Sequence, residues 1–343
     1  MKESRYALLC AGMGAGLLGV MVMAVNFGAL NLKSSWIFKI IVNGIFGCEL
    51  FAGEWKPQLV SIVWNLRLPK VIAAALIGAS LSLSGIFMQA VTRNPLADPF
   101  VLGVSSGAST GAVAAILLGG LPLIGTFSLQ AGAFAGAIIA SILVFTLSGG
   151  GGPSRLALTG AAIAAVFAAL TNLLIFISAD THKINSAVFW MTGSLAGITW
   201  EQLPAAVAIF FAGLCTGILT RRPLDIMLSG EERARSLGVD VKTLRRALMV
   251  VSALLAGVSV SISGVIGFVG LVIPHISRTL FGPVHRRLIA PACLLGAAFM
   301  VAADLLARVL AKPEEMPAGV ITALAGAPFF LHLLRRGMYK FGD

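Results

Sequence analysis

The sequence predicts an all-α polytopic membrane protein with about ten transmembrane helices in two repeated halves. Of its 343 residues, 58% are hydrophobic and 11% are charged, whereas soluble domains carry about 25% charged residues. Apolar runs approaching the roughly 20 residues that a bilayer-spanning helix needs follow one another along the chain. A twelve-residue segment also recurs 179 positions later. The composition therefore excludes a soluble globular protein, and the recurrence indicates two related halves.

The repeated segment occupies residues 74–85 and again residues 253–264. Seven of the twelve aligned positions are identical, including every Gly and Ser, and the others exchange one apolar residue for another. Small residues at this density let transmembrane helices pack closely. We expect one transmembrane domain over residues 1–343, with halves at roughly 1–178 and 179–343.

Ten apolar segments are the candidate spans. They are residues 6–30, 68–90, 100–120, 127–148, 156–178, 203–220, 247–265, 267–281, 288–311 and 317–334. Glycines and Pro274 interrupt the stretch 247–281, so it forms either two short helices or one bent helix. Residues 184–199 are apolar but short, which fits a half-helix at one surface. Residues 32–51 are mixed in polarity and are expected outside the bilayer.

The distribution of Lys and Arg predicts the orientation. With ten spans both termini lie on one side, and the segments on that side carry 17 of the 25 basic residues. Because cytoplasmic loops are enriched in Lys and Arg, we expect both termini in the cytoplasm. The repeat copies then lie on the second and seventh spans, which cross in opposite directions. The halves are therefore expected to have inverted topology.

The longest loop on the inner side covers residues 220–246 and contains a short predicted helix at 230–237. Ser229 can cap the amino end of this helix through its hydroxyl group. Glu231 and Glu232 in the first turn suit the positive end of the helix dipole. The loop is therefore expected to present an ordered helix to the cytoplasm.

Three further residues define how this helix would end and what it would present. Gly238 is a natural helix stop. Ala234 and Leu237 are expected to share one face, and a short helix with such a face can seat in a groove on a partner. The alternative is a solvated connecting loop without a partner.

Six segments spread in order along nearly the whole chain carry a family resemblance. They are Arg67-Leu68-Pro69-Lys70, the stretch from Gln89 through Arg93-Asn94-Pro95-Leu96-Ala97-Asp98-Pro99 to Ala108, Gly230–Val239, Gly267–His275, Ala303–Arg308 and Pro317–Phe330. These segments resemble the FecCD-type permeases of ABC importers for iron-siderophore, haem and cobalamin. One departure is Lys70, where Arg is common in the family.

The resemblance implies an assembly. It implies ten spans per subunit, a second permease subunit that is identical or homologous, two cytoplasmic ABC ATPase subunits and an extracytoplasmic solute-binding protein. It implies an ATPase-coupling surface formed by Leu228, Gly230, Glu231, Glu232, Ala234, Leu237, Gly238, Arg93, Asn94 and Pro95. The surrounding medium is membrane lipid of the bacterial inner membrane, and no nucleic acid partner is expected.

Arg67, Lys70 and Arg308 oppose the positive-inside trend. The resemblance implies that they dock the binding protein, because permeases of the family receive its acidic residues at matching positions. The alternative is interfacial snorkelling without a partner. Asp304 lies four residues before Arg308 on the same helix face, so it is expected to orient that side chain.

The resemblance further implies a translocation pathway between the two permease subunits, lined largely by the fifth and tenth spans. In the fifth span the candidate lining residues are Asn172, Phe176 and Ser178. The alternative is that Asn172 bonds to a neighbouring helix and Phe176 packs in the core.

The chain lacks the G-x-x-x-x-G-K-[ST] loop that cradles phosphate, since the glycine run 149–152 leads to Pro153. It is therefore expected not to be an enzyme. ATP and Mg²⁺ belong to a partner ATPase, and this chain is expected to bind no cofactor and no metal.

The expected function is that of a permease subunit that moves an iron-siderophore complex across the inner membrane. Haem or cobalamin import is the alternative within the family. An ion-coupled secondary transporter is the alternative of another class, and it usually requires a lone carboxylate in mid-membrane, which the spans lack.

Overall fold

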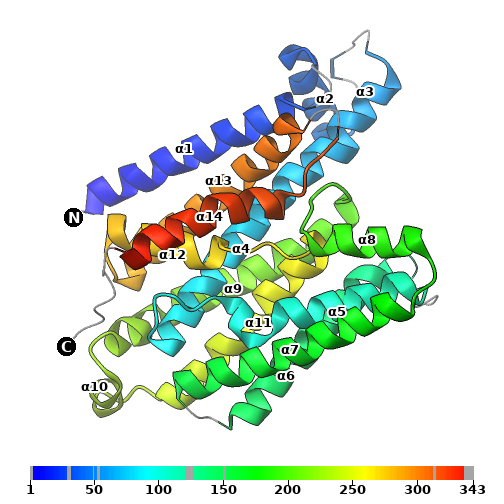
Figure 1. The fold of residues 1–343 in the computed structure, drawn as a ribbon. Coiled ribbons are helices and arrows are strands. Elements are labelled where there is room, and N and C mark those ends of the chain that lie inside the picture. Colours follow the sequence, from blue (N-terminus) through cyan, green and yellow to red (C-terminus); the bar gives the residue numbers. More distant parts are fainter. Residues whose placement is uncertain are drawn as a thin grey trace.

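The structure, a computed structural model, describes residues 3–28, 32–48, 50–51, 55–119, 125, 127–149, 152–311 and 314–335. These described residues form helices and no strands (Figure 1). In chain order the helices are α1 (Glu3–Asn26), α2 (Ser34–Phe46), α3 (Pro57–Ser61), η1 (Ile62–Arg67), α4 (Leu68–Thr92), η2 (Pro99–Leu102), α5 (Val104–Leu117), α6 (Ser128–Ser148), α7 (Pro153–Ile177), α8 (Thr181–Met191), η4 (Trp200–Gln202), α9 (Leu203–Met227), α10 (Glu231–Ser236), α11 (Val241–Ser263), α12 (Val269–Phe281), α13 (His285–Leu310) and α14 (Ala318–Arg335).

The ten predicted spans correspond to ten of these helices. In the described part of the chain, seven helical segments are long and apolar enough to cross a membrane: α1, the continuous α3–η1–α4 segment, α6, α7, η4 with α9, α11 and α13. The helices α5, α12 and α14 are apolar but shorter, and so is α2. The predicted all-α polytopic fold is confirmed. The stretch 247–281 forms two helices, α11 and α12.

Two helix boundaries differ from the prediction. The second span begins at Pro57 rather than at residue 68, because α3 and η1 run directly into α4. The sixth span continues through Pro223 to Met227, so the connection to α11 is shorter than 220–246. Leu224 and Met227 are buried in this extension. Their burial stabilises the extension of α9 beyond residue 220, where the apolar run predicted its end.

The two halves repeat the same pattern of neighbours. The shift between the repeat copies pairs α4 with α11 and the following three helices α5–α7 with α12–α14. In the structure α4 packs on α13 and α11 packs on α6, so each repeat helix contacts the opposite half. Within the halves, α5 contacts α6 and α7, and α12 contacts α13 and α14.

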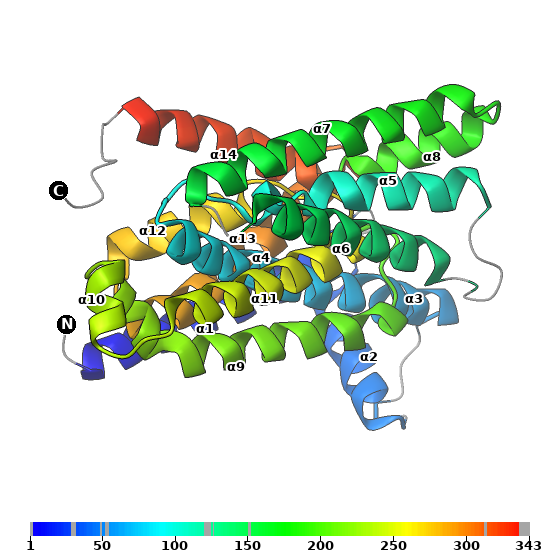
Figure 2. The same cartoon turned by 90° about the horizontal axis from the view of Figure 1, so that it is seen from below.

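The repeat helices run in opposite directions. Thr92 at the carboxyl end of α4 and Lys242 at the amino end of α11 line one cavity, so these two ends meet at one face of the bundle. The predicted inverted topology is therefore confirmed. We call this face the α10 end and the opposite face, with α2, α3 and α8, the α8 end (Figures 1 and 2).

The amino end of α1 and the carboxyl end of α14 both lie at the α10 end (Figure 2). Glu3 of α1 forms an ion pair of 2.7 Å with Arg286 in the first turn of α13. Gly149 and Gly152 flank the connection between α6 and α7, and Gly150 and Gly151 of the glycine run lie outside the described residues.

The glycines of the first repeat copy allow close helix approach. A Cβ atom on Gly78 would lie 2.1 Å from the carbonyl oxygen of Gly296 on α13, and one on Gly85 would lie 1.8 Å from that of Gly270 on α12. No side chain fits at such distances, so backbone approaches backbone at both positions. The predicted packing role of this segment is confirmed on α4.

Candidate functional site

Backbone geometry determines where the short helix α10 begins and ends. Gly230 at its amino cap has a φ of +111°, a conformation that favours glycine. The predicted cap by Ser229 is wrong, because the amino-cap position is occupied by Gly230, which has no side chain. The predicted stop at Gly238 is confirmed: its φ is +82°, and the next amide, of Val239, donates to the carbonyl oxygen of Ala234 at 3.0 Å.

Packing separates the two residues that were expected to share one face of α10. Ala234 is fully buried against Met227 at the end of α9 and Val241 at the start of α11. Leu237, in contrast, is 62% exposed, and so is much of Leu228 before the helix. The prediction that Ala234 and Leu237 share one face is therefore wrong. Ala234 anchors α10 to the bundle, whereas Leu237 and Leu228 are available to a partner.

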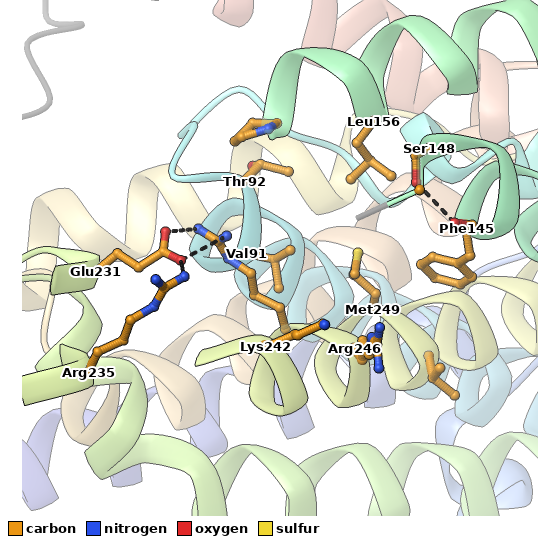
Figure 3. A pocket seen from close by; sticks show the side chains of 14 residues that line it. Val91, Thr92, Phe145, Ser148, Leu156, Glu231, Arg235, Lys242, Arg246 and Met249 are labelled. Carbon is orange, nitrogen blue, oxygen red and sulfur yellow. Dashed lines mark hydrogen bonds and ion pairs between the residues drawn. The ribbon is translucent and has the colours of Figure 1, made fainter. Parts of the chain in front are cut away.

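An ion-pair cluster holds α10 against α11. Glu231 accepts from Arg235 one turn later at 2.7 Å and from Arg245 of α11 at 2.9 Å (Figure 3). Glu232 is exposed. Asp240 caps α11 by accepting from the amide and the hydroxyl group of Thr243, and these hydrogen bonds lower the pKa of Asp240. The amino end of α10 is thus fixed to α11 through Glu231, while the outer side of α10 stays open.

A second pair ties the end of α9 to the start of α13. The Oδ1 atom of Asp225 accepts from the backbone amide of His285 at 2.6 Å and lies 2.9 Å from its Nδ1 atom. The amide belongs to the first turn of α13, where helix donors lack intrahelical partners. Asp225 therefore caps a helix other than its own.

The connection after α4 is ordered by its own side chains. Arg93 ends α4 with a φ of +52° and is exposed, as is Asn94. The Oδ1 atom of Asn94 accepts from the amide of Leu96 at 2.9 Å, and Pro95 is half-buried. Asp98 caps η2 through the amide of Phe100 at 2.9 Å. Burial raises the pKa of Asp98 to about 6, although this hydrogen bond opposes the change.

One cavity brings the two parts of the predicted coupling surface together. It has a volume of about 480 Å³ and is lined by Arg93 on one side and by residues 228–230 on another. Its remaining lining residues are Gln89, Ala90, Leu224, Met227, Arg278, Pro283 and His285. Gln89 accepts a hydrogen bond from Arg278, which fixes this wall. Segments far apart in the sequence thus form one recessed surface at the α10 end.

The residues predicted to dock a binding protein meet at the α8 end, but inside the bundle. Arg67, Lys70 and Arg308 are 7%, 6% and 4% exposed. The guanidinium groups of Arg67 and Arg308 donate to carbonyl oxygens of residues 24–27 at 2.9 to 3.2 Å. They therefore cap the carboxyl end of α1, where carbonyl groups lack partners and the helix dipole is negative.

Two of these three residues also have acidic partners. Lys70 forms an ion pair of 2.5 Å with Glu315, and Arg308 forms one of 2.8 Å with Asp304. The expected orienting role of Asp304 is confirmed. The alternative of snorkelling without a partner is wrong, because each cation is partnered. Docking by these residues stays a prediction, which the described contacts do not test.

The profile of the FecCD transport family matches residues 16–336. The chain belongs to the FecCD transport family. Its relatives in that family have several substrates by name. The chain is 42% identical to the hemin transport system permease HmuU of Yersinia pestis, over 91% of each chain. It is 43% identical to the cobalamin import system permease BtuC of Halobacterium salinarum, over 80% of this chain and 73% of that one.

Two further relatives cover most of the chain. The Fe(3+) dicitrate transport system permease FecD of Escherichia coli is 38% identical, over 80% of this chain and 85% of that one. A solved structure described as an inward-facing conformation of a metal-chelate type ABC transporter superposes with a TM-score of 0.78 at 32% identity, covering 96% of this chain and 99% of that one. The protein is therefore an ABC importer permease, and the resemblance is confirmed.

In this FecCD permease the predicted pathway residues lie on an uncovered face of α7. Phe176 is 86% exposed, and Asn172 is exposed as well. Ser178 follows the helix and accepts weakly from the amide of Asp180 at 3.4 Å. The alternative of core packing by Phe176 is wrong within this subunit. The structure leaves both side chains free to face something outside it.

Sequence reasoning missed Asp225, His285 and Arg245, whose contacts hold together the helices of the predicted coupling surface. Glu231 and Arg245 lie on different helices, and Asp225 and His285 lie in different spans. No helical period links such positions. A weak signal was present, because Asp225 is an isolated carboxylate between the basic residues of one span and the start of the predicted helix.

Proposed function

We propose that this FecCD permease imports an iron-siderophore complex across the bacterial inner membrane, driven by ATP hydrolysis on a separate chain. One observation supports the proposed contact with the ATPase. The segment that leads into α10 and Arg93 line the same cavity, and α10 is tied to α11 by Glu231. The relatives named for Fe(3+) dicitrate and for a metal chelate support an iron chelate as substrate. The relatives named for hemin and cobalamin make those compounds the second candidates.

The α10 end is the proposed contact with two cytoplasmic ABC ATPases. A contact that transmits motion needs a rigid attachment and an exposed surface. Glu231 and Ala234 supply the attachment, and Leu228, Glu232 and Leu237 are exposed beside it. Both termini are then cytoplasmic, in agreement with the distribution of basic residues. ATP and Mg²⁺ would bind the partner only.

The uncovered face of α7 is the proposed contact with a second permease subunit, identical or homologous. Phe176 and Asn172 would line the pathway between the subunits, together with Ser178. The α8 end would then face the extracytoplasmic solute-binding protein. An ion-coupled transporter has less support, because the carboxylate of Asp304 is paired with Arg308 rather than free to carry a proton.

The test is transport into proteoliposomes that contain the permease, its ATPase and its binding protein. Labelled ferric siderophore, haem and cobalamin are supplied separately, with and without ATP. We expect ATP-dependent uptake of the ferric siderophore. Preferred uptake of haem or cobalamin would show that this compound, and not a ferric siderophore, is the substrate. Uptake driven by an ion gradient without the ATPase would overturn the proposal.

A variant pair tests the coupling surface. Leu237→Glu should reduce ATP-driven import strongly, because it places a charge on the exposed side of α10. Arg222→Gln, a charge change on α9 at the same end, serves as the control. Equal import by both variants would contradict the assignment of α10.

A further inference from the structure

A second cavity at the α10 end is not used by the proposed coupling contact. It has a volume of about 550 Å³ and opens between the carboxyl ends of α4 and α6 and the amino ends of α7 and α11 (Figure 3). Its apolar lining residues are Val91, Phe145, Leu156, Met249 and Val250. Its charged lining residues are Arg235, Lys242, Arg245, Arg246 and Glu231. The cavity is thus apolar on one side and strongly basic on the other.

The basic side has unbalanced charge. Among the described residues, Glu231 is the sole carboxylate of the lining, and Arg235 and Arg245 already bind it at 2.7 and 2.9 Å. The side chains of Lys242 and Arg246 form no hydrogen bond or ion pair with the described residues, although the Asp240 carboxylate lies near enough to attract Lys242. They lie four residues apart on α11, so both can reach one anion.

The apolar side lies on helices that are long and apolar enough to span a membrane. Val250 lines the cavity and is 48% exposed, on a helix long and apolar enough to cross the membrane. Phe145 lies one turn before the end of α6, another spanning helix. The cavity therefore extends from the ends of the spanning helices into the zone that acyl chains occupy. A soluble anion would leave this apolar side empty, and so would a polar protein loop.

We propose that this cavity binds an anionic phospholipid. The phosphate group lies between Lys242 and Arg246, and an acyl chain lies along Phe145, Leu156 and Val250. Basic pockets between transmembrane helices on the cytoplasmic side are suited to anionic headgroups. The amino ends of α7 and α11 attract the anion and the carboxyl ends of α4 and α6 repel it, so the side chains decide the selectivity.

A bound lipid would touch the clamp that holds α10. Its phosphate would lie beside Arg235 and Arg245 and compete with Glu231 for them. The lipid composition of the membrane would then change how firmly α10 is held. This consequence does not depend on the identity of the transported substrate.

The test uses the purified, delipidated transporter with its full-length permease. Native mass spectrometry measures the binding of phosphatidylglycerol, of phosphatidylcholine with the same acyl chains, and of inorganic phosphate. The variants are K242Q/R246Q, which removes the unpartnered charges, and Val250→Trp, which fills the apolar side. The matched control is R222Q/R233Q, which removes two exposed charges at the same end outside the cavity lining.

We expect wild type and control to prefer phosphatidylglycerol over phosphatidylcholine by about tenfold, and K242Q/R246Q to lose most of that preference. Val250→Trp should weaken binding of either lipid. Equal affinity for both lipids in wild type, or equal behaviour of K242Q/R246Q and the control, would overturn the proposal. Displacement of phosphatidylglycerol by an equal concentration of inorganic phosphate would assign the site to a soluble anion. Loss of the ATPase from lipid-free K242Q/R246Q would assign it to the protein partner.

Discussion

The hydroxyl oxygens of Ser84 on α4 and Ser252 on α11 lie 2.6 Å apart. Ser84 donates to the carbonyl oxygen of Ser252 at 2.9 Å, and Ser252 donates to that of Ser84 at 3.2 Å. Both side chains are fully buried, at the contact between the equivalent helices of the two halves. Ser84 belongs to the repeat and aligns with Ser263, whereas Ser252 precedes the second copy. The reciprocal bond therefore joins the halves through non-equivalent positions.

Substitutions of Ser84 and Ser252 should have non-additive effects on the free energy of unfolding. Ser84→Ala and Ser252→Ala should each lower the free energy of unfolding by roughly 0.6 kcal/mol, a typical value for an interhelical hydrogen bond in a membrane. The double variant should cost less than the sum, because the second change removes a partner that is already lost. Unfolding in mixed micelles measures this, with Ser186→Ala on α8 as the exposed control. Strict additivity would contradict a direct coupling.

The Glu231–Arg245 pair should matter more for coupling than for stability. Partly exposed ion pairs contribute about 0.2–1 kcal/mol to folding, so E231Q and R245Q should unfold nearly like wild type. Both should lower ATP-driven import several-fold, because α10 is then held to α11 less firmly, by the packing of Ala234 alone. Arg235→Gln is the control, since Arg235 pairs with Glu231 within α10 only. Equal import rates of R245Q and R235Q would show that the Glu231–Arg245 pair is not needed for coupling.

Removing Arg308 should be far more costly than removing a surface cation. Arg308→Gln leaves the buried carboxylate of Asp304 unpaired, which costs about 3–5 kcal/mol. The double variant D304N/R308Q should recover part of that loss. Glu3→Gln breaks the exposed Glu3–Arg286 pair and should change the melting temperature little. A small effect of R308Q, equal to that of E3Q, would contradict a buried pair.

Two carboxylates outside the spans should respond to pH with opposite signs. Burial raises the pKa of Asp98 from 3.8 to about 6, so folding favours its protonated form, and its ionisation lowers stability as pH rises from about 4 to 6. Asp98→Asn keeps the capping oxygen without the charge. The stability of D98N relative to wild type should therefore increase from about pH 4 to 6, and D98N should remain the more stable protein above pH 6.

Asp240 supplies the matched comparison. Hydrogen bonds from Thr243 lower its pKa, so its carboxylate stabilises the fold above the ordinary value of 3.8 and the benefit is lost only below it. Asp240→Asn should thus be less stable than wild type at pH 7. Melting temperatures from pH 4 to 8 measure both variants. Parallel curves for D98N and wild type would show that Asp98 has an ordinary pKa.

The affinity of the solute-binding protein for the α8 end should change when Lys70 is released from its ion pair with Glu315. An acidic binding protein that uses Lys70 must compete with Glu315, so Glu315→Gln should strengthen its affinity and Lys70→Gln should weaken it. Both differences should fade at 1 M salt, where the Debye length is about 3 Å. Glu314→Gln, which removes a neighbouring exposed charge, is the control. Affinities of E315Q and K70Q equal to that of E314Q would leave Lys70 with a structural role only.

Much of the fold follows from local sequence. The apolar runs located the spans, and the glycine-broken stretch after α11 marked a real break, because span length and backbone freedom depend on the residues of one segment. The repeat between residues 74–85 and 253–264 indicated the halves. The short helix of the predicted coupling surface was also located, since Gly230 and Gly238 bound it by their own backbone preferences.

Tertiary contacts decided what the local pattern left open. Arg67 and Arg308 could have faced water, and they turn inward because the carboxyl end of α1 lies beside them with unpaired carbonyl groups. Ala234 is buried and Leu237 is exposed because only one side of α10 meets α9 and α11. Burial and pairing depend on which helix lies next to a residue. Helices distant in sequence supply those neighbours, so residue spacing within one segment cannot determine them.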